Sequence, residues 1–97
     1  MRISVRFFTN LREIANKREE TLSFPDGEKV TVDRVLKAFA KEYGKAFVDY
    51  VYDSKTGEVK GFLQLLVNGT STSTLKGLGT ELKDGDVLAI LPPVGAG

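Results

Sequence analysis

Residues 31–44 read TVDRVLKAFAKEYG, and this stretch decides the class of fold. Its apolar side chains share one side of an α-helix because they recur at intervals of three and four residues: Val32, Val35, Leu36, Phe39, Ala40 and Tyr43. Thr31 is a predicted N-cap, Asp33 suits the positive first turn, and Gly44 can take the left-handed conformation that ends a helix. The stretch therefore predicts one amphipathic helix that needs an apolar surface to cover.

Strand patterns flank this helix on both sides. Residues 2–8 and 21–24 alternate apolar and polar side chains, and the short connection between them favours an antiparallel pair. After a short second helix or turn at residues 45–53, the segments GFLQLLVNG (61–69) and VLAIL (87–91) are apolar enough for strands. Between those two strands, we expect leucines to anchor an irregular segment onto the core: Leu75, Leu78 and Leu82. The order predicts an α+β domain, with one mixed sheet and one long helix packed across it.

The composition excludes several classes of function. Fourteen basic and 13 acidic residues leave a net charge of +1, so nothing indicates a nucleic-acid partner. Cysteine and histidine are absent, which excludes disulfides, thiol nucleophiles, zinc fingers and imidazole bases. Acidic residues are too sparse for a calcium loop, so we expect no metal site. Without a signal peptide or a long apolar run, the expected location is the cytoplasm, away from membranes.

The last strand runs into LPPVGAG, residues 91–97. Pro92 and Pro93 cannot donate to a β-ladder and favour an extended start, although they could also simply block strand addition at a sheet edge. Fully extended, the last five residues would reach roughly 15–18 Å from the body of the domain. With little side chain beyond Val94, a flexible tail of about residues 94–97 could thread a narrow channel in another protein.

Three stretches carry a resemblance to a known family: RFFTNLREIA near the start, LVNG in the middle and LKDGDVLAILPPVGAG at the end. They resemble the small subunit of molybdopterin synthase and, equally, the small archaeal modifier proteins. The resemblance covers nearly the whole chain, and the C-terminal stretch is its most specific part. It implies a single domain, residues 1–97, with the β-grasp or ubiquitin-like fold.

The resemblance also implies a chemistry for Gly97. In that family an E1-like activating enzyme uses ATP and magnesium to convert the C-terminal carboxylate into an acyl-adenylate. Sulfur then replaces AMP to give a thiocarboxylate, which a large synthase subunit uses in molybdenum (or tungsten) cofactor biosynthesis. In modifier proteins the activated glycine instead forms an isopeptide bond with a target lysine. The chain itself would be a carrier that binds no cofactor, with the catalytic groups on its partners.

Site residues follow from the same resemblance. Gly97 would carry the reacting carboxyl, and the residues that thread into the partner would be Pro92, Pro93, Val94, Gly95 and Ala96. Ala96 stands where the family usually has a penultimate glycine. Its methyl group excludes the backbone angles that only glycine adopts. A domain with an inert tail, acting as a plain binding module, is the alternative from another class of function.

A partner surface is expected at the root of the tail. Phe8 lies on the strand side opposite Ile3, Val5 and Phe7, and Leu91 ends the last strand. In the family the first and last strands are neighbours, which would bring Phe8 and Leu91 into one patch, with Arg12 as a charged contact at its rim. The alternative is that Phe8 packs beneath residues 70–83.

Overall fold

The computed structural model describes residues 1–92 of the chain. The predicted threading residues Pro93, Val94, Gly95 and Ala96, and the reacting carboxyl of Gly97, therefore lie outside the described residues. Pro92 is the last residue of the described part and directly follows the last strand.

The described chain forms a five-stranded sheet with helices. The strands are β1 (Arg2–Phe7), β2 (Glu19–Ser23), β3 (Gln64–Val67), β4 (Thr70–Ser71) and β5 (Val87–Leu91). The α-helices are α1 (Asn10–Ala15), α2 (Val32–Tyr43) and α3 (Lys45–Val51), and two 3-10 helices, η1 (Thr72–Thr74) and η2 (Gly77–Gly79), lie between β4 and β5.

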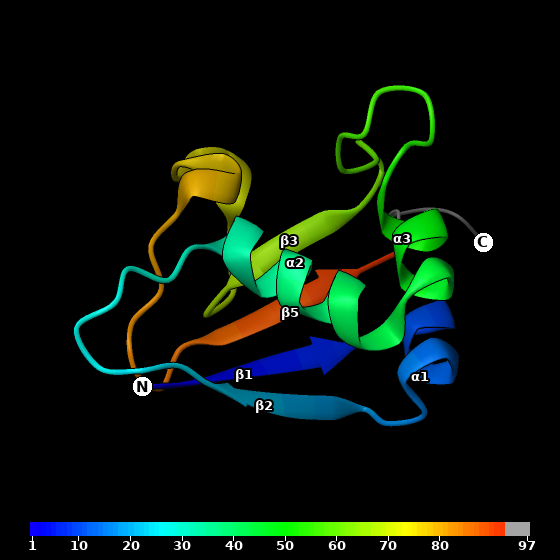
Figure 1. The fold of residues 1–97 in the computed structure, drawn as a ribbon. Helices are drawn as coiled ribbons and strands as arrows, with labels where there is room; N and C mark the ends of the chain where they lie inside the picture. The colour runs from blue at the N-terminus through cyan, green and yellow to red at the C-terminus, as the bar shows by residue number, and fades with distance from the viewer. Residues whose placement is uncertain (93–97) are drawn as a thin grey trace.

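The strands lie in the order β2-β1-β5-β3-β4. β1 pairs antiparallel with β2 and parallel with β5, and the remaining pairs are antiparallel, so the sheet is mixed, as predicted. Figure 1 shows α2 lying across one face of this sheet, with α1 and α3 near the end at which β1 finishes. The parallel pairing of β1 and β5 places the first and last strands side by side at the centre of the sheet.

Helix α2 forms as its sequence predicts. The Thr31 hydroxyl accepts a hydrogen bond from the Arg34 N–H at 3.2 Å, which satisfies one of the free donors of the first turn. At the other end Gly44 has φ 69°, and its N–H donates to the Ala40 carbonyl at 3.0 Å. Asp33 pairs with Lys37 one turn later, at 2.9 Å.

The core lies between α2 and the sheet and is centred on aromatic rings. Phe39 is fully buried, and its ring centroid lies 5.3 Å from that of Phe7 in an edge-to-face arrangement. Tyr43 and Phe47 contribute rings at 5.8 and 6.0 Å from Phe39. The strands contribute the buried residues of their inward faces: Ile3, Val5, Leu65, Val67, Leu88 and Ile90.

Three local expectations differ from the structure. The predicted connection after β1 contains a helix, α1, because Leu11 and Ala15 are buried against the core. β3 starts at Gln64 rather than at residue 61, because the chain turns at residues 61–62 before it enters the sheet. Leu75 was expected to be a core anchor, and this prediction is wrong: its side chain is 46% exposed, whereas Leu82 is buried as expected.

Asp53 organises the loop between α3 and β3. Its carboxylate accepts hydrogen bonds from the N–H groups of Lys55 at 2.7 Å and Thr56 at 3.1 Å, and these bonds lower the pKa of the Asp53 carboxyl. Because the folded-state pKa is the lower one, the stabilisation is present above about pH 4, the ordinary value for aspartate, and is lost as pH falls through the folded-state pKa.

We therefore expect Asp53→Ala to lower the free energy of unfolding at neutral pH and to have progressively less effect as the solution is acidified. Urea unfolding of both proteins at a series of pH values measures this difference. A difference that stays constant into strong acid would contradict the role of the ionised carboxylate. Glu58→Ala, which removes an exposed carboxylate from the same loop, is the control for a general charge effect.

Candidate partner-binding surface

The ends of β1 and β5 meet where the described chain finishes. Phe7 lies opposite Ile90 in the parallel pair, so Phe8 and Leu91, the next residues along, are neighbours at this end of the sheet. Both side chains are half-buried. The first and last strands are therefore neighbours, as expected, and Pro92 continues from this end; a shared partner-binding patch of Phe8 and Leu91 stays a prediction.

A tight turn holds Phe8 in place. The Phe8 carbonyl accepts the Leu11 N–H at 3.1 Å, and Leu11 is buried, so the turn is tied to the core. Thr9, between strand and helix, has φ 47°, an unusual backbone angle for a β-branched residue. The segment that follows β4 lies beyond β3, at the other edge of the sheet, so the structure does not bear out the alternative that Phe8 packs beneath residues 70–83.

Arg12 lies directly against this turn. Its Nε donates a hydrogen bond to the Phe7 carbonyl at 3.0 Å, and its guanidinium carbon is 5.3 Å from the centroid of the Phe8 ring. The ring face attracts the cation, while the hydrogen bond limits the side-chain positions available to it. Arg12 is an exposed residue, so its charge is available beside Phe8 at the root of the tail.

Apolar residues continue across the face of the sheet opposite α2. Leu66 and Arg6 both lie opposite Ala89, and successive strand side chains alternate between faces, so Leu91 shares the face of Ala89. We call Phe8, Leu66, Ala89 and Leu91 the sheet patch. Each of these four residues is partly exposed, which makes the patch a surface that a partner could cover.

The edge of the sheet patch carries positive charge. Arg6 is 58% exposed and lies 3.7 Å from the carboxylate of Glu19, a distance and exposure at which an ion pair contributes little to stability. With Arg12 close to Phe8, two arginines border the apolar residues. An apolar centre with a polar, charged rim is the usual composition of a protein interface.

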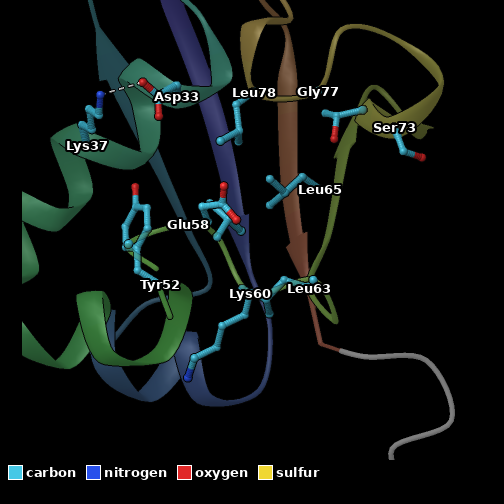
Figure 2. Close-up of a pocket in the computed structure, with 14 residues that line it drawn as sticks. Asp33, Lys37, Tyr52, Glu58, Lys60, Leu63, Leu65, Ser73, Gly77 and Leu78 are labelled. Atoms are coloured by element: carbon cyan, nitrogen blue, oxygen red, sulfur yellow. Dashed lines mark ion pairs between the residues drawn. The ribbon is translucent and has the colours of Figure 1, made fainter. Parts of the chain in front are cut away.

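A separate hollow of about 550 Å³ lies on the α2 side of the sheet (Figure 2). Leu63, Leu65 and Leu78 line its apolar part, and the ion pair of Asp33 and Lys37 lies at its edge.

Tyr52 also lines this hollow, and its hydroxyl is buried without a hydrogen-bond partner in the described structure. Burial and the nearby Asp33 carboxylate raise the pKa of the Tyr52 hydroxyl. This hydroxyl is therefore protonated at neutral pH and can donate a hydrogen bond. The sequence has no cysteine or histidine that could serve as a nucleophile or a base next to it.

Residues 1–92 lack two kinds of feature. In this part of the chain, no helix combines the length and the apolar character needed to cross a bilayer. The same residues contain no group of three acidic, histidine or cysteine side chains arranged to hold a metal ion.

Comparison with known proteins identifies the family. The model of the ThiS family matches residues 5–97, which is nearly the whole chain. The chain belongs to the ThiS family. Small archaeal modifier protein 3 of Haloferax volcanii is 32% identical over 97 residues, and the match covers both chains completely.

Solved structures of other proteins share this fold. The solution structure of small archaeal modifier protein 1 from Methanosarcina acetivorans has a TM-score of 0.76 at 38% identity, with 99% of this chain and 96% of that one covered. A putative molybdopterin converting factor subunit 1 from Pyrococcus furiosus has a TM-score of 0.73 at 28% identity, with 97% and 99% covered. The predicted β-grasp, ubiquitin-like fold is confirmed.

Membership of the ThiS family determines the type of protein. The chain is a ThiS-type sulfur carrier or small modifier, a non-catalytic carrier rather than an enzyme. The family implies an E1-like activating enzyme as partner.

Sequence reasoning missed some features of this ThiS-family chain. It did not find the hollow around Tyr52, because the residues that line it come from distant segments. It placed Phe62 inside a strand, whereas Phe62 lies in a turn with 49% of its side chain exposed. The preceding Gly61 is the one signal that could have indicated this turn.

Proposed function

We propose that this chain carries sulfur as a thiocarboxylate on Gly97 and donates it in molybdopterin (or tungsten-pterin) synthesis as the small synthase subunit. The observation that carries the proposal is the sheet patch at the root of the tail. Phe8 and Leu91 are brought together where Pro92 leaves the sheet, so a partner that covers the patch also stands beside the start of the tail.

The chemistry begins with a poor electrophile. The Gly97 carboxylate attacks the α-phosphorus of ATP, held with magnesium by the activating partner, and pyrophosphate leaves. Hydrosulfide then attacks the acyl carbon of the adenylate, AMP leaves with the electron pair, the S–H proton passes to solvent, and the thiocarboxylate remains on Gly97. Pro92, Pro93 and the small residues Gly95 and Ala96 would thread this carboxyl into the partner's catalytic centre.

Two facts support this function. The chain has no cysteine, so it cannot carry sulfur as a persulfide. The C-terminal carboxyl is therefore the group that would carry the sulfur. The similarity to a putative molybdopterin converting factor subunit, over 97% of this chain, agrees with a role in pterin chemistry. In that role the receiving partner is the large synthase subunit, which binds the pterin precursor.

The direct test is intact-mass spectrometry of the full chain after incubation with its activating enzyme, ATP, magnesium and sulfide. Replacement of one carboxylate oxygen by sulfur is expected to add about 16 Da, at Gly97. Added pterin precursor and large subunit should then return the mass to its starting value. If neither the wild type nor Ala96→Gly acquires the added mass, the sulfur-carrier function is wrong.

Conjugation to proteins is the second candidate function. The full-length similarity to small archaeal modifier protein 3 favours it. Here the ε-amine of a target lysine attacks the activated Gly97, and an isopeptide bond forms as AMP or a thiol leaves. Affinity capture of the chain from its host, followed by a mass-spectrometric search for lysines that carry a C-terminal remnant, tests conjugation, and an absence of such lysines would contradict it. Both can operate through the same activated carboxyl.

A further inference from the structure

Phe62 is an exposed aromatic residue close to the root of the tail. Within the described residues the large apolar side chains that are exposed are Val48, Phe62 and Leu75, and Phe62 is the most exposed at 49%. Gln64 lies opposite Leu91 in the antiparallel pair of β3 and β5. Phe62 precedes Gln64 by two residues, so it lies at the end of the sheet at which β5 finishes.

The backbone around Phe62 is held firmly. The Leu63 N–H donates to the Lys60 carbonyl at 3.2 Å, which closes a turn around Phe62. The Lys60 N–H donates to the Val51 carbonyl at 2.8 Å, and Leu63 is buried, so both ends of the turn are tied to the domain. A side chain presented by such a turn loses little conformational freedom when a partner covers it.

Lys60 lies beside the exposed ring. Its Nζ donates to the Asp49 carbonyl at 2.8 Å and lies 5.8 Å from the centroid of the Phe62 ring. Figure 2 shows Leu63 near the end of β5 and the Lys60 side chain extending from there toward the helices. The ammonium group therefore has a defined place, between a carbonyl of α3 and an aromatic face.

We propose that Phe62 and Lys60, close to the end of β5, form a second anchor for the activating protein that receives Gly97. The inference rests on the proposed function. The positive groups at this end of the domain include Arg6, Arg12, Arg18 and Lys60. Arg6 is paired with Glu19, and the Asp49 carboxylate on the α3 turn beside Lys60 is paired with Lys45. By charge complementarity, the partner surface is an apolar pocket for Phe62 edged by aspartate or glutamate carboxylates that face Lys60.

Leu75 provides a matched control because it is equally exposed but lies elsewhere. It follows η1, and β4 before it pairs with Leu66 and Val67, at the end of β3 away from Gln64. Figure 1 shows η1 and η2 at the end of the molecule opposite to where β5 finishes. General loss of exposed apolar surface would affect both residues, whereas a partner contact at the tail root would affect Phe62 alone.

The experiment measures ATP–pyrophosphate exchange by the E1-like activating enzyme of the same genome, with the full chain as the varied substrate. Phe62→Ala is expected to raise KM about tenfold and to leave kcat at saturation unchanged, because an anchor contributes to binding and not to the chemical step. Lys60→Glu is expected to raise KM by a similar factor, Lys60→Arg to stay close to wild type, and Leu75→Ala to remain within about twofold.

Each outcome supports or overturns the inference. Equal KM values for Phe62→Ala, Leu75→Ala and wild type would overturn it while leaving the proposed function intact. An unchanged KM for Lys60→Glu would overturn the acidic edge of the partner's pocket. If the wild type itself supports no exchange, the proposed function fails and the inference falls with it. Circular dichroism of each variant confirms that an altered KM does not come from unfolding.

Discussion

Deletion of Gly97 is expected to lower kcat/KM for ATP-dependent activation by at least about a hundredfold, the cost of moving a reacting group out of position. The deletion leaves a free carboxylate on Ala96, but it withdraws that group by about 3.3 Å along the chain. Attack on the α-phosphorus requires van der Waals contact. When the folded domain is bound in its usual position on the enzyme, the carboxylate on Ala96 therefore no longer reaches the phosphorus. Pyrophosphate exchange and intact-mass spectrometry measure the loss.

The shortened chain should still bind the activating enzyme. Phe8, Arg12 and Leu91 are untouched by the deletion, so the truncated protein is expected to inhibit activation of the wild type competitively. Its inhibition constant should be close to the wild-type KM. Activation of the shortened chain at the wild-type rate would contradict the role of Gly97. Loss of both activation and inhibition would instead show that Gly97 contributes to binding as well.

Substitution of Phe39 by alanine is expected to lower the free energy of unfolding by about 3–5 kcal/mol, the usual cost of removing a buried phenylalanine. The Phe39 ring is fully buried and contacts the rings of Phe7, Tyr43 and Phe47 within 5.3–6.0 Å. Domains of this size are stable by roughly 5–15 kcal/mol, so the variant loses a large share of its stability. Urea unfolding followed by circular dichroism measures the change.

Phe62→Ala is the control for the Phe39 variant because it removes the same ring from an exposed place. Phe62 makes a cation–π contact with Lys60, so the expected loss is below about 1 kcal/mol. The melting temperature should fall by roughly 12–40 °C for Phe39→Ala, on a scale of about 4–8 °C for each kcal/mol, and by less than about 8 °C for Phe62→Ala. Similar losses for the two variants would contradict the assignment of Phe39 to the centre of the core.

The long helix could be predicted because its signals are local. The apolar spacing, the Thr31 cap and Gly44 all lie within one stretch, and the structure uses each of them. The short helix α1 could not be predicted in the same way, because six residues are too few to show a helical period. It forms because Leu11 and Ala15 are buried in the core, and their burial depends on the rest of the fold.

The exposure of leucines and aromatics was harder to predict. Leu75, Leu78 and Leu82 lie in one small-residue-rich segment, yet only the last is buried to the level of the core. Two 3-10 turns set which of them faces inward, and these turns have no clear pattern in the sequence. Phe62 is similar: its residue type predicts burial, and the turn between Lys60 and Leu63 exposes it.

For this protein, the sequence alone determined the elements and the chemistry available to them: one amphipathic helix among strands, no cysteine or histidine, and a slim stretch ending in Gly97. Only the tertiary structure decided which residues meet. Phe8 and Leu91 become neighbours through the parallel pairing of β1 with β5, and Phe62 reaches the same end through the pairing of Gln64 with Leu91. The physical reason is that periodicity and caps act within a few residues, whereas strand order and register depend on how all the apolar faces are buried together.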